Sequence, residues 1–278
     1  MMRIHHLDCG SHHPLGGRLY DDASTGLYAH ICTHCMLIEL ADSLVLVDTG
    51  YGLQDVRRGG RRRLSHLWPL VLNPALLEAQ TAIRQVEALG YSANDVRHIV
   101  LTHLDFDHAG GLEDFPAAVV HLLAVEKAAA EMRHQGLVGR QRYRPRQWDS
   151  VREWRTYSPL GERWYGFDAV RQLEGLPPDL LLVPLSGHTR GHAGVAVATA
   201  AGWLLDAGDA YLHRSELTAD QRMPPGLAVY ERIMMADPPA ARANLARLKE
   251  LHQGHAPQVQ IFCSHDTSEL LQLQASTT

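Results

Sequence analysis

The chain has 278 residues, of which 45% are hydrophobic, and its formal net charge is -5 at pH 7. This acidic balance does not favour binding to nucleic acid or to an anionic membrane. No apolar run reaches the about 18 residues of a membrane span, and MMRIHHLDCG at the N-terminus lacks the apolar region of a secretory signal. We therefore expect a cytoplasmic protein with reduced cysteines, folded as a single domain over residues 1–278, because no linker or repeat marks a boundary.

The first predicted elements are two strands within CMLIELADSLVLVD (35–48), which are separated by a polar turn. A loop rich in arginine follows at 57–63. Asn73 and Pro74 then predict the start of a helix, because Asn is a good N-cap and Pro suits the first helical position. An apolar stripe with helical spacing continues this helix, and Gly90 is expected to end it.

The rest of the chain alternates short apolar runs with helical patterns. Further strands are predicted at 98–103, 119–124, 180–185, 194–199, 203–208 and 259–263. Helices are predicted at about 124–134 and 238–252. This order indicates sheets at the centre of the molecule with helices outside them.

The stretch THLDFDHAGG (102–111) concentrates metal-ligand side chains at the end of a predicted strand. Residues two apart in an extended segment point the same way, so His103 and Asp105 can face one point. If a helical turn then starts, Asp107 and His108 face a second point beside the first. The spacing is therefore consistent with two metal sites next to each other.

Further ligand-type residues follow three later predicted strands. His188 and His192 lie in SGHTRGH, Asp209 follows WLLDAG, and His265 follows VQIFC. Catalytic groups on loops at strand ends are typical of a rigid scaffold that carries function on its loops. The set supplies imidazole and carboxylate without thiolate, which suits Zn, Mn or Fe better than a structural zinc site rich in cysteine.

HLDFDH, followed in order by GHTRGH, GDAY and SHD, resembles the metallo-β-lactamase superfamily. The DTG at 48–50 also matches, and the resemblance covers about 37–266. The SHD ending and the tyrosine after the GD pair look most like the N-acyl homoserine lactonase group. The resemblance implies an α/β fold, a four-layer αββα sandwich of two mixed sheets with helices on the outer faces.

The same resemblance implies a set of metal ligands: His103 and His188 for the first ion, Asp107, His108 and His265 for the second, and Asp209 for both. Asp105 departs from the pattern, because the family has histidine there. A carboxylate is still a good ligand for zinc, and it suits harder ions such as Mn²⁺ better than imidazole does. Alternatively, Asp105 faces away and leaves the first site short of one ligand.

The resemblance also implies roles around the ligands. Asp107 would both bind metal and orient the nucleophile or pass a proton. Tyr211 would donate a hydrogen bond to the developing oxyanion. Asp48 and Asp266 would orient ligand imidazoles through hydrogen bonds, and His192 would support the site without binding metal.

We therefore expect a hydrolase that opens a lactone or cleaves a small carbonyl ester with a hydroxide shared by two divalent ions. Zn²⁺ is the expected metal, with Mn²⁺ or Fe²⁺ as alternatives, and the partner is a small-molecule substrate, without nucleic acid or membrane; a homodimer is left open. The alternatives are a phosphodiesterase of the same superfamily, or an iron-binding oxidoreductase or low-activity metal-binding protein. Only Asp105 favours the last two.

Four other features have less specific interpretations. The segment 137–167 interleaves arginine with aromatic residues and is predicted to form a lid or substrate wall, with a packing loop as the alternative. The arginines at 57–63 are expected in a solvated loop or a dimer contact, and Cys32 and Cys35 as a buried thiol pair. Ordinary polar contacts are expected for His5, His6, His12, His13, His30 and His98, although the N-terminal loop could line the mouth of the site.

Overall fold

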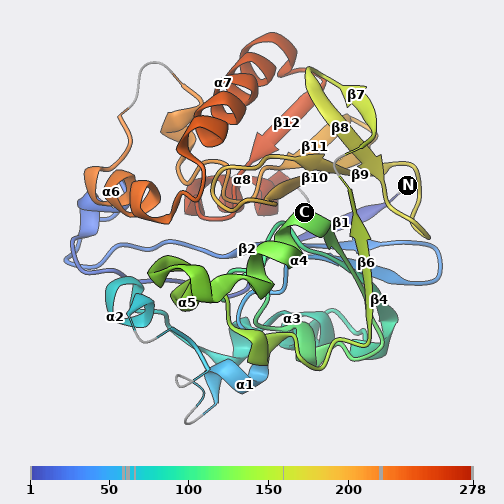
Figure 1. Ribbon diagram of the computed structural model, residues 1–278, viewed down its shortest axis with the longest axis horizontal. Helices are drawn as coiled ribbons and strands as arrows, with labels where there is room; N and C mark the ends of the chain where they lie inside the picture. The colour runs from blue at the N-terminus through green and yellow to red at the C-terminus, as the bar shows by residue number, and fades with distance from the viewer. Residues whose placement is uncertain are drawn as a thin grey trace.

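A computed structural model describes residues 2–57, 60, 63–65, 67–158, 160–218 and 222–276. Two mixed six-stranded sheets lie face to face, with helices on their outer sides (Figure 1). The first sheet has the order β1 (Arg3–Asp8), β2 (His34–Glu39), β3 (Leu44–Val47), β4 (Val96–Val100), β5 (Val119–Leu123) and β6 (Glu153–Tyr157). The second has the order β12 (Val259–Phe262), β11 (Gly202–Asp206), β10 (Ala193–Thr199), β9 (Leu180–Pro184), β8 (Phe167–Gln172) and β7 (Glu162–Trp164).

Both sheets mix strand directions. In the first sheet β1, β2 and β3 pair antiparallel and β3 to β6 pair parallel. In the second sheet β11 and β12 pair parallel, and the remaining pairs are antiparallel. The four-layer sandwich predicted from the sequence is therefore confirmed.

Several of the helices cover the outer faces of the sandwich. Their bounds are α1 (Leu53–Val56), α2 (Trp68–Leu72), α3 (Ala82–Ala88), α4 (Ala124–Glu131), α5 (Leu137–Arg142), α6 (Pro225–Met234), α7 (Pro238–His255) and α8 (Thr267–Ser276). Val86 of α3 and Ala130 of α4 pack in the cluster behind the first sheet, and Leu248 of α7 packs behind the second. Within the described residues, no helix has the length and apolarity that crossing a bilayer requires.

A buried apolar layer holds the two sheets together. Ile38 and Val45 of the first sheet and Leu182 and Val195 of the second belong to one cluster, and each is fully buried. These residues alternate along their strands with side chains that pack under the outer helices, as expected for strands buried on both faces. The sandwich is thus a rigid support for the loops at its edge.

The helix predicted from Asn73 is the main error in the predicted elements. Asn73 lies instead at the end of α2 with a left-handed φ of 47°, which Asn tolerates better than most residues. Leu76 also has a positive φ of 50°, so α3 does not begin until Ala82. Gly90 follows the end of α3 with a φ of 92°, as the sequence predicted.

The segment 137–167 is built into the sandwich. Its first part is α5, and its later parts are β6 and β7, which are the edge strands of the first and second sheets. Figure 1 shows β6 running along the side of the molecule between the two layers. The segment therefore supplies one edge strand to each sheet.

Candidate metal centre

Four strand ends converge at one edge of the sandwich. His103 follows β4, His188 follows β9, Asp209 follows β11 and His265 follows β12. The predicted ligands are all buried there, with exposed fractions of 8% or less: His103, Asp105, Asp107, His108, His188, Asp209 and His265. The structure thus brings together side chains that are more than 160 residues apart in the sequence.

Asp105 lies with the first group of donors. Its Oδ2 is 3.1 Å from His188 Nε2 and 3.6 Å from His103 Nε2. Oδ2 of Asp209 is 3.3 Å from His188 Nε2 and 3.8 Å from His103 Nε2. Ligand atoms placed tetrahedrally about 2.0–2.2 Å from a zinc ion lie about 3.3–3.6 Å from one another. The distances from each histidine to these two carboxylates are therefore close to the donor spacing of a tetrahedral site.

The other oxygen of Asp209 faces a second group. Its Oδ1 is 3.4 Å from His108 Nε2 and 3.3 Å from His265 Nε2. His265 Nε2 is in turn 3.8 Å from Asp107 Oδ2. Asp209 thus presents one oxygen to each group, which is the arrangement expected of a bridging ligand.

Several donor atoms have no hydrogen-bond partner among the described residues. His103 Nε2, His108 Nε2 and Asp209 Oδ1 are buried without a hydrogen bond. Buried polar atoms normally have partners, because leaving one unsatisfied costs about 1–3 kcal/mol. Divalent cations would satisfy these atoms and balance the carboxylates, so the residues present fit divalent metal ions.

Hydrogen bonds from other residues orient the ligand rings. Asp48 Oδ2 accepts from His108 Nδ1 at 2.7 Å, as predicted, and Asp48 Oδ1 accepts from the Thr102 backbone N–H at 2.8 Å. His265 Nδ1 donates instead to the Cys32 carbonyl oxygen at 2.8 Å. The prediction for Asp266 was therefore wrong. Its carboxylate accepts from the side chain of Arg214 at 3.0 Å and caps the start of α8.

Comparisons with known proteins agree with this geometry. The model of the Metallo-beta-lactamase superfamily matches residues 33–254. The chain belongs to the metallo-β-lactamase superfamily. A probable metallo-hydrolase of Mycobacterium tuberculosis is 42% identical over 276 residues, which cover 99% of this chain and 84% of the relative. At this level, the prediction of a metal-dependent hydrolase is supported.

Lactonases are among the similar proteins. An N-acyl homoserine lactonase of Bacillus thuringiensis is 27% identical over 128 residues, or 44% of this chain and 51% of the relative. The structure of a Bacillus thuringiensis AiiA mutant with N-decanoyl-L-homoserine at its active site superposes with a TM-score of 0.71. That match covers 97% of this chain and 95% of the other at 21% identity, so it shows the shared fold.

Tyr211 does not join the ligands of this metallo-β-lactamase fold. Its hydroxyl donates to Glu269 at 3.0 Å, and its ring is fully buried in the cluster behind the second sheet. The Tyr211 hydroxyl is therefore bonded to Glu269 and is not available at the site. The oxyanion role predicted for it is wrong. The mistaken prediction arose because the short spacing from Asp209 says nothing about which way the side chain points.

Tyr230 and His12 are two of the site residues that the sequence did not reveal. Tyr230 of α6 lines a narrow pocket together with His12, Asp107 and His265. Burial, and after it the negative charge of Asp107, raise the pKa of the Tyr230 hydroxyl well above its usual value, so it remains a hydrogen-bond donor. Nothing in PGLAVYERIM marks this tyrosine out.

His12 comes from the N-terminal loop that the sequence allowed at the mouth of the site. Its Nε2 is 2.8 Å from the Tyr51 hydroxyl and 3.8 Å from Asp107 Oδ2. Burial lowers the pKa of His12 well below its usual value, so the ring is neutral. Its bond to Tyr51 is the polar contact predicted for it, and its ring also lies beside the possible ligand atoms of Asp107 and His265.

His192 supports the bridging residue without joining the donor groups. Its Nδ1 donates to the Leu185 carbonyl oxygen at 3.1 Å, and its Nε2 accepts from the Asp209 backbone N–H at 2.9 Å. Burial lowers the pKa of His192 to about 3, which keeps Nε2 free to accept. The ring thus fixes the loop that carries Asp209.

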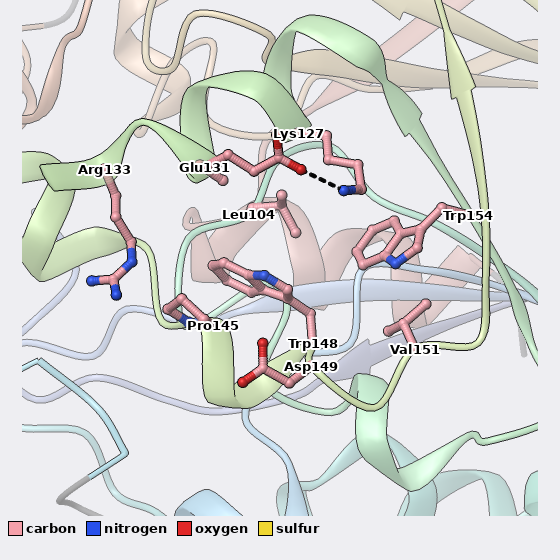
Figure 2. A pocket seen from close by; sticks show the side chains of 10 residues that line it. Leu104, Lys127, Glu131, Arg133, Pro145, Trp148, Asp149, Val151 and Trp154 are labelled. Atoms are coloured by element: carbon pink, nitrogen blue, oxygen red, sulfur yellow. Dashed lines mark hydrogen bonds and ion pairs between the residues drawn. The ribbon is translucent and has the colours of Figure 1, made fainter. Parts of the chain in front are cut away.

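The aromatic part of segment 137–167 faces a different cavity. Trp148 and Trp154 line a pocket of about 400 Å³ beside α4, and Figure 2 shows both rings near Lys127 and Leu104. Lys127 Nζ lies 5.5 Å from the centre of the Trp154 ring and 2.7 Å from Glu131. Leu104 lines this pocket, whereas none of the predicted metal ligands is among its described lining residues. These tryptophans therefore do not form a wall over the donor groups.

Other predictions have simple outcomes. Cys9, Cys32, Cys35 and Cys263 are free thiols and all are buried. Three arginines of the loop at 57–63 lie outside the described residues: Arg58, Arg61 and Arg62. Arg57 is exposed, as predicted for a solvated loop, whereas Arg63 is partly buried and forms ion pairs with Asp55 and Glu113.

Proposed function

We propose that this protein is a dinuclear metal-dependent hydrolase that opens lactones or cleaves small carbonyl esters. The single observation that carries the proposal is Asp209, whose two oxygens face two separate groups of buried donors. A purely structural metal site has no use for two adjacent ions with a shared carboxylate. Zn²⁺ remains the expected metal, and a homodimer remains a prediction.

The chain's own residues would divide the work. His103, Asp105 and His188 would hold one ion, and Asp107, His108 and His265 the other, with Asp209 shared. Two such ions supply Lewis acidity and a water that ionises near neutral pH. Asp107 lies between His12 and His265, where its carboxylate can orient the attacking water and pass a proton. Tyr230 takes the hydrogen-bonding role expected of Tyr211.

The residues that line the pocket favour a carbonyl substrate with an apolar substituent. Beside His12, Asp107, Tyr230 and His265, its lining residues are Tyr20, Ile31, Leu72, Leu212 and Leu227. Among the described lining residues none is Lys or Arg, which a phosphodiester substrate would call for. The apolar lining suits an acyl chain, and solved lactonases of this fold include one with N-hexanoyl-L-homoserine at its catalytic metal centre. Together these points support an N-acyl lactone as the first substrate to test.

The test is turnover by metal-loaded protein on N-acyl homoserine lactones of several chain lengths, aryl esters and bis(p-nitrophenyl) phosphate. We expect hydrolysis of the lactones and none of the phosphodiester. Asp107→Asn should remove activity while the circular dichroism spectrum stays unchanged, and Asp42→Asn, in an exposed turn, is the matched control. Cleavage of the phosphodiester without lactone turnover would overturn the proposal in favour of the phosphodiesterase alternative.

A further inference from the structure

Arg142, at the end of α5, reaches the first group of donors from the side. Its side chain is buried with 2% exposure. Its Nη1 donates to the His188 carbonyl oxygen at 2.8 Å, and its Nη2 donates to the Met234 carbonyl oxygen at 2.7 Å. These two bonds hold the guanidinium in place, and its Nε lies 3.3 Å from Asp105 Oδ1, an ion pair without a hydrogen bond.

Asp105 therefore has two different faces. Its Oδ2 points to His188 Nε2 and His103 Nε2, at 3.1 and 3.6 Å, while its Oδ1 points to Arg142. A carboxylate can bind a metal ion through one oxygen and a cation through the other, which a histidine at this position cannot do. The departure from the family pattern at 105 thus coincides with a buried positive charge beside it.

We propose that Asp105 and Arg142 act as one unit in place of the usual histidine: Asp105 binds the first ion through Oδ2, and Arg142 cancels its charge. This inference rests on the proposed dinuclear function and adds Arg142 to it as a positioning residue. The guanidinium also holds Asp105 at the donor group, since a buried ion pair that loses one partner leaves an uncompensated charge.

Charge balance gives the physical reason for the pair. The donors include three carboxylates, Asp105, Asp107 and Asp209, where a histidine at 105 would leave two. An extra carboxylate would weaken the Lewis acidity of the ions and make their shared water less acidic. With Arg142 counted, the buried cluster returns to a formal charge of two negatives. Arg142 is fully ionised in proteins, so this compensation does not vary with pH.

A rival arrangement uses the same residues differently. Arg142 Nη2 is 3.4 Å from His188 Nε2, the atom that would bind the first ion. If the guanidinium took the place of that ion, the protein would hold a single metal at the second group. The two arrangements differ in the number of ions per chain, which can be counted directly.

The experiment compares wild type, Asp105→His, Asp105→Asn, Arg142→Gln and the double variant Asp105→His/Arg142→Gln. Arg144→Gln is a matched control on a neighbouring arginine outside the donor groups. Metal content is measured by elemental analysis, and Zn²⁺ affinity by competition with a chromophoric chelator. We expect two ions in the wild type. Asp105→His should lose one ion, or bind it tenfold or more weakly, because its ring meets the guanidinium. The double variant should regain it.

Three outcomes would overturn the inference. They are one ion in the wild type with two in Arg142→Gln, no recovery in the double variant, and retention of both ions by Asp105→Asn. The last variant keeps Arg142 and its carbonyl bonds, so it remains informative if Arg142→Gln does not fold. Because metal content is the readout, the result is separate from whether any lactone is hydrolysed.

Discussion

Glu126 accepts a hydrogen bond from the Thr189 hydroxyl at 2.6 Å and thereby joins two ligand loops. The same carboxylate accepts from the backbone N–H of Gly191 at 3.1 Å and, through its other oxygen, from that of Leu104 at 3.0 Å. Leu104 lies between two donors of the first group, and Thr189 follows His188. A buried side chain of α4 thus sets the spacing between the loop after β4 and the loop after β9.

Replacing Glu126 should loosen both loops. Glu126→Ala leaves two buried backbone N–H groups and one hydroxyl without partners, so we expect a loss of about 3 kcal/mol in the free energy of unfolding. Urea unfolding of the metal-loaded protein measures this. Glu131→Ala, in the same helix, removes an exposed ion pair with Lys127 and should cost less than about 1 kcal/mol. Equal losses in the two variants would contradict the bridging role.

Tyr230 and Tyr211 should respond oppositely to the loss of a hydroxyl. Tyr230→Phe is expected to lower kcat for lactone hydrolysis by about tenfold to a hundredfold with little change in thermal stability, since Tyr230 lines the pocket beside Asp107 and His265. Tyr211→Phe is expected to keep kcat and to lower the free energy of unfolding by about 1 kcal/mol through its lost bond to Glu269. Steady-state kinetics and thermal unfolding of both variants test this difference. A normal kcat in Tyr230→Phe would show that the Tyr230 hydroxyl has no role in the mechanism.

Metal removal should destabilise the protein. Without cations the buried carboxylates of the donor groups repel one another, and ligands that bind only the folded state stabilise it by about 2.7 kcal/mol at a hundred times Kd. We expect Tm to fall in a chelator and to recover when Zn²⁺ is added. The Tm of His265→Ala should rise less than that of the wild type when Zn²⁺ is added. An unchanged Tm in the chelator would count against a metal centre at this edge of the sandwich.

Glu231 should make stability depend on pH in a specific direction. Burial, and after it the adjacent Glu216, raise the pKa of Glu231 to about 8 from a model-peptide value of 4.5. The folded state therefore keeps a proton that the unfolded state releases, so the free energy of unfolding falls as pH rises between about 4.5 and 8. Glu231→Gln, which resembles the protonated form, should flatten this decline.

The measurement is Tm of the metal-loaded protein at several pH values from 5 to 9. Glu250→Gln is the control, because Glu250 is exposed in α7. If wild type and Glu231→Gln lost stability in parallel over this range, the pair of buried carboxyl groups would not be the cause.

The sequence predicted the parts of this molecule that local patterns encode. The apolar runs that form β3, β5 and β9 and the ligand motif at 103–108 needed no knowledge of the fold to be recognised. β1 was not predicted, because RIHHLD alternates only partly and gains its stability by pairing with β2. Propensity likewise favoured a helix at Asn73, where tertiary contacts impose a left-handed turn instead.

The residues at the site that escaped prediction share a different cause. Arg142, Tyr230 and His12 reach the ligands from α5, α6 and the N-terminal loop, far from the motif in sequence. The direction of a side chain could not be predicted either. Tyr211 and Asp266 have the expected residue types and spacing, but their side chains point away from the ligands. Ligands that follow one strand can be predicted from the sequence. Site residues that come from other elements can be identified only from the three-dimensional structure.

The path of segment 137–167 links the metal centre to the outer frame of the fold. Its start carries Arg142 to the donors, and its continuation supplies β6 and β7 as the rims of both sheets. A chimera that received this segment from a relative would exchange both rims and the guanidinium in a single step. Asp105 would then face the side chain that the relative has in place of Arg142. Residue 105 and segment 137–167 therefore have to be exchanged together.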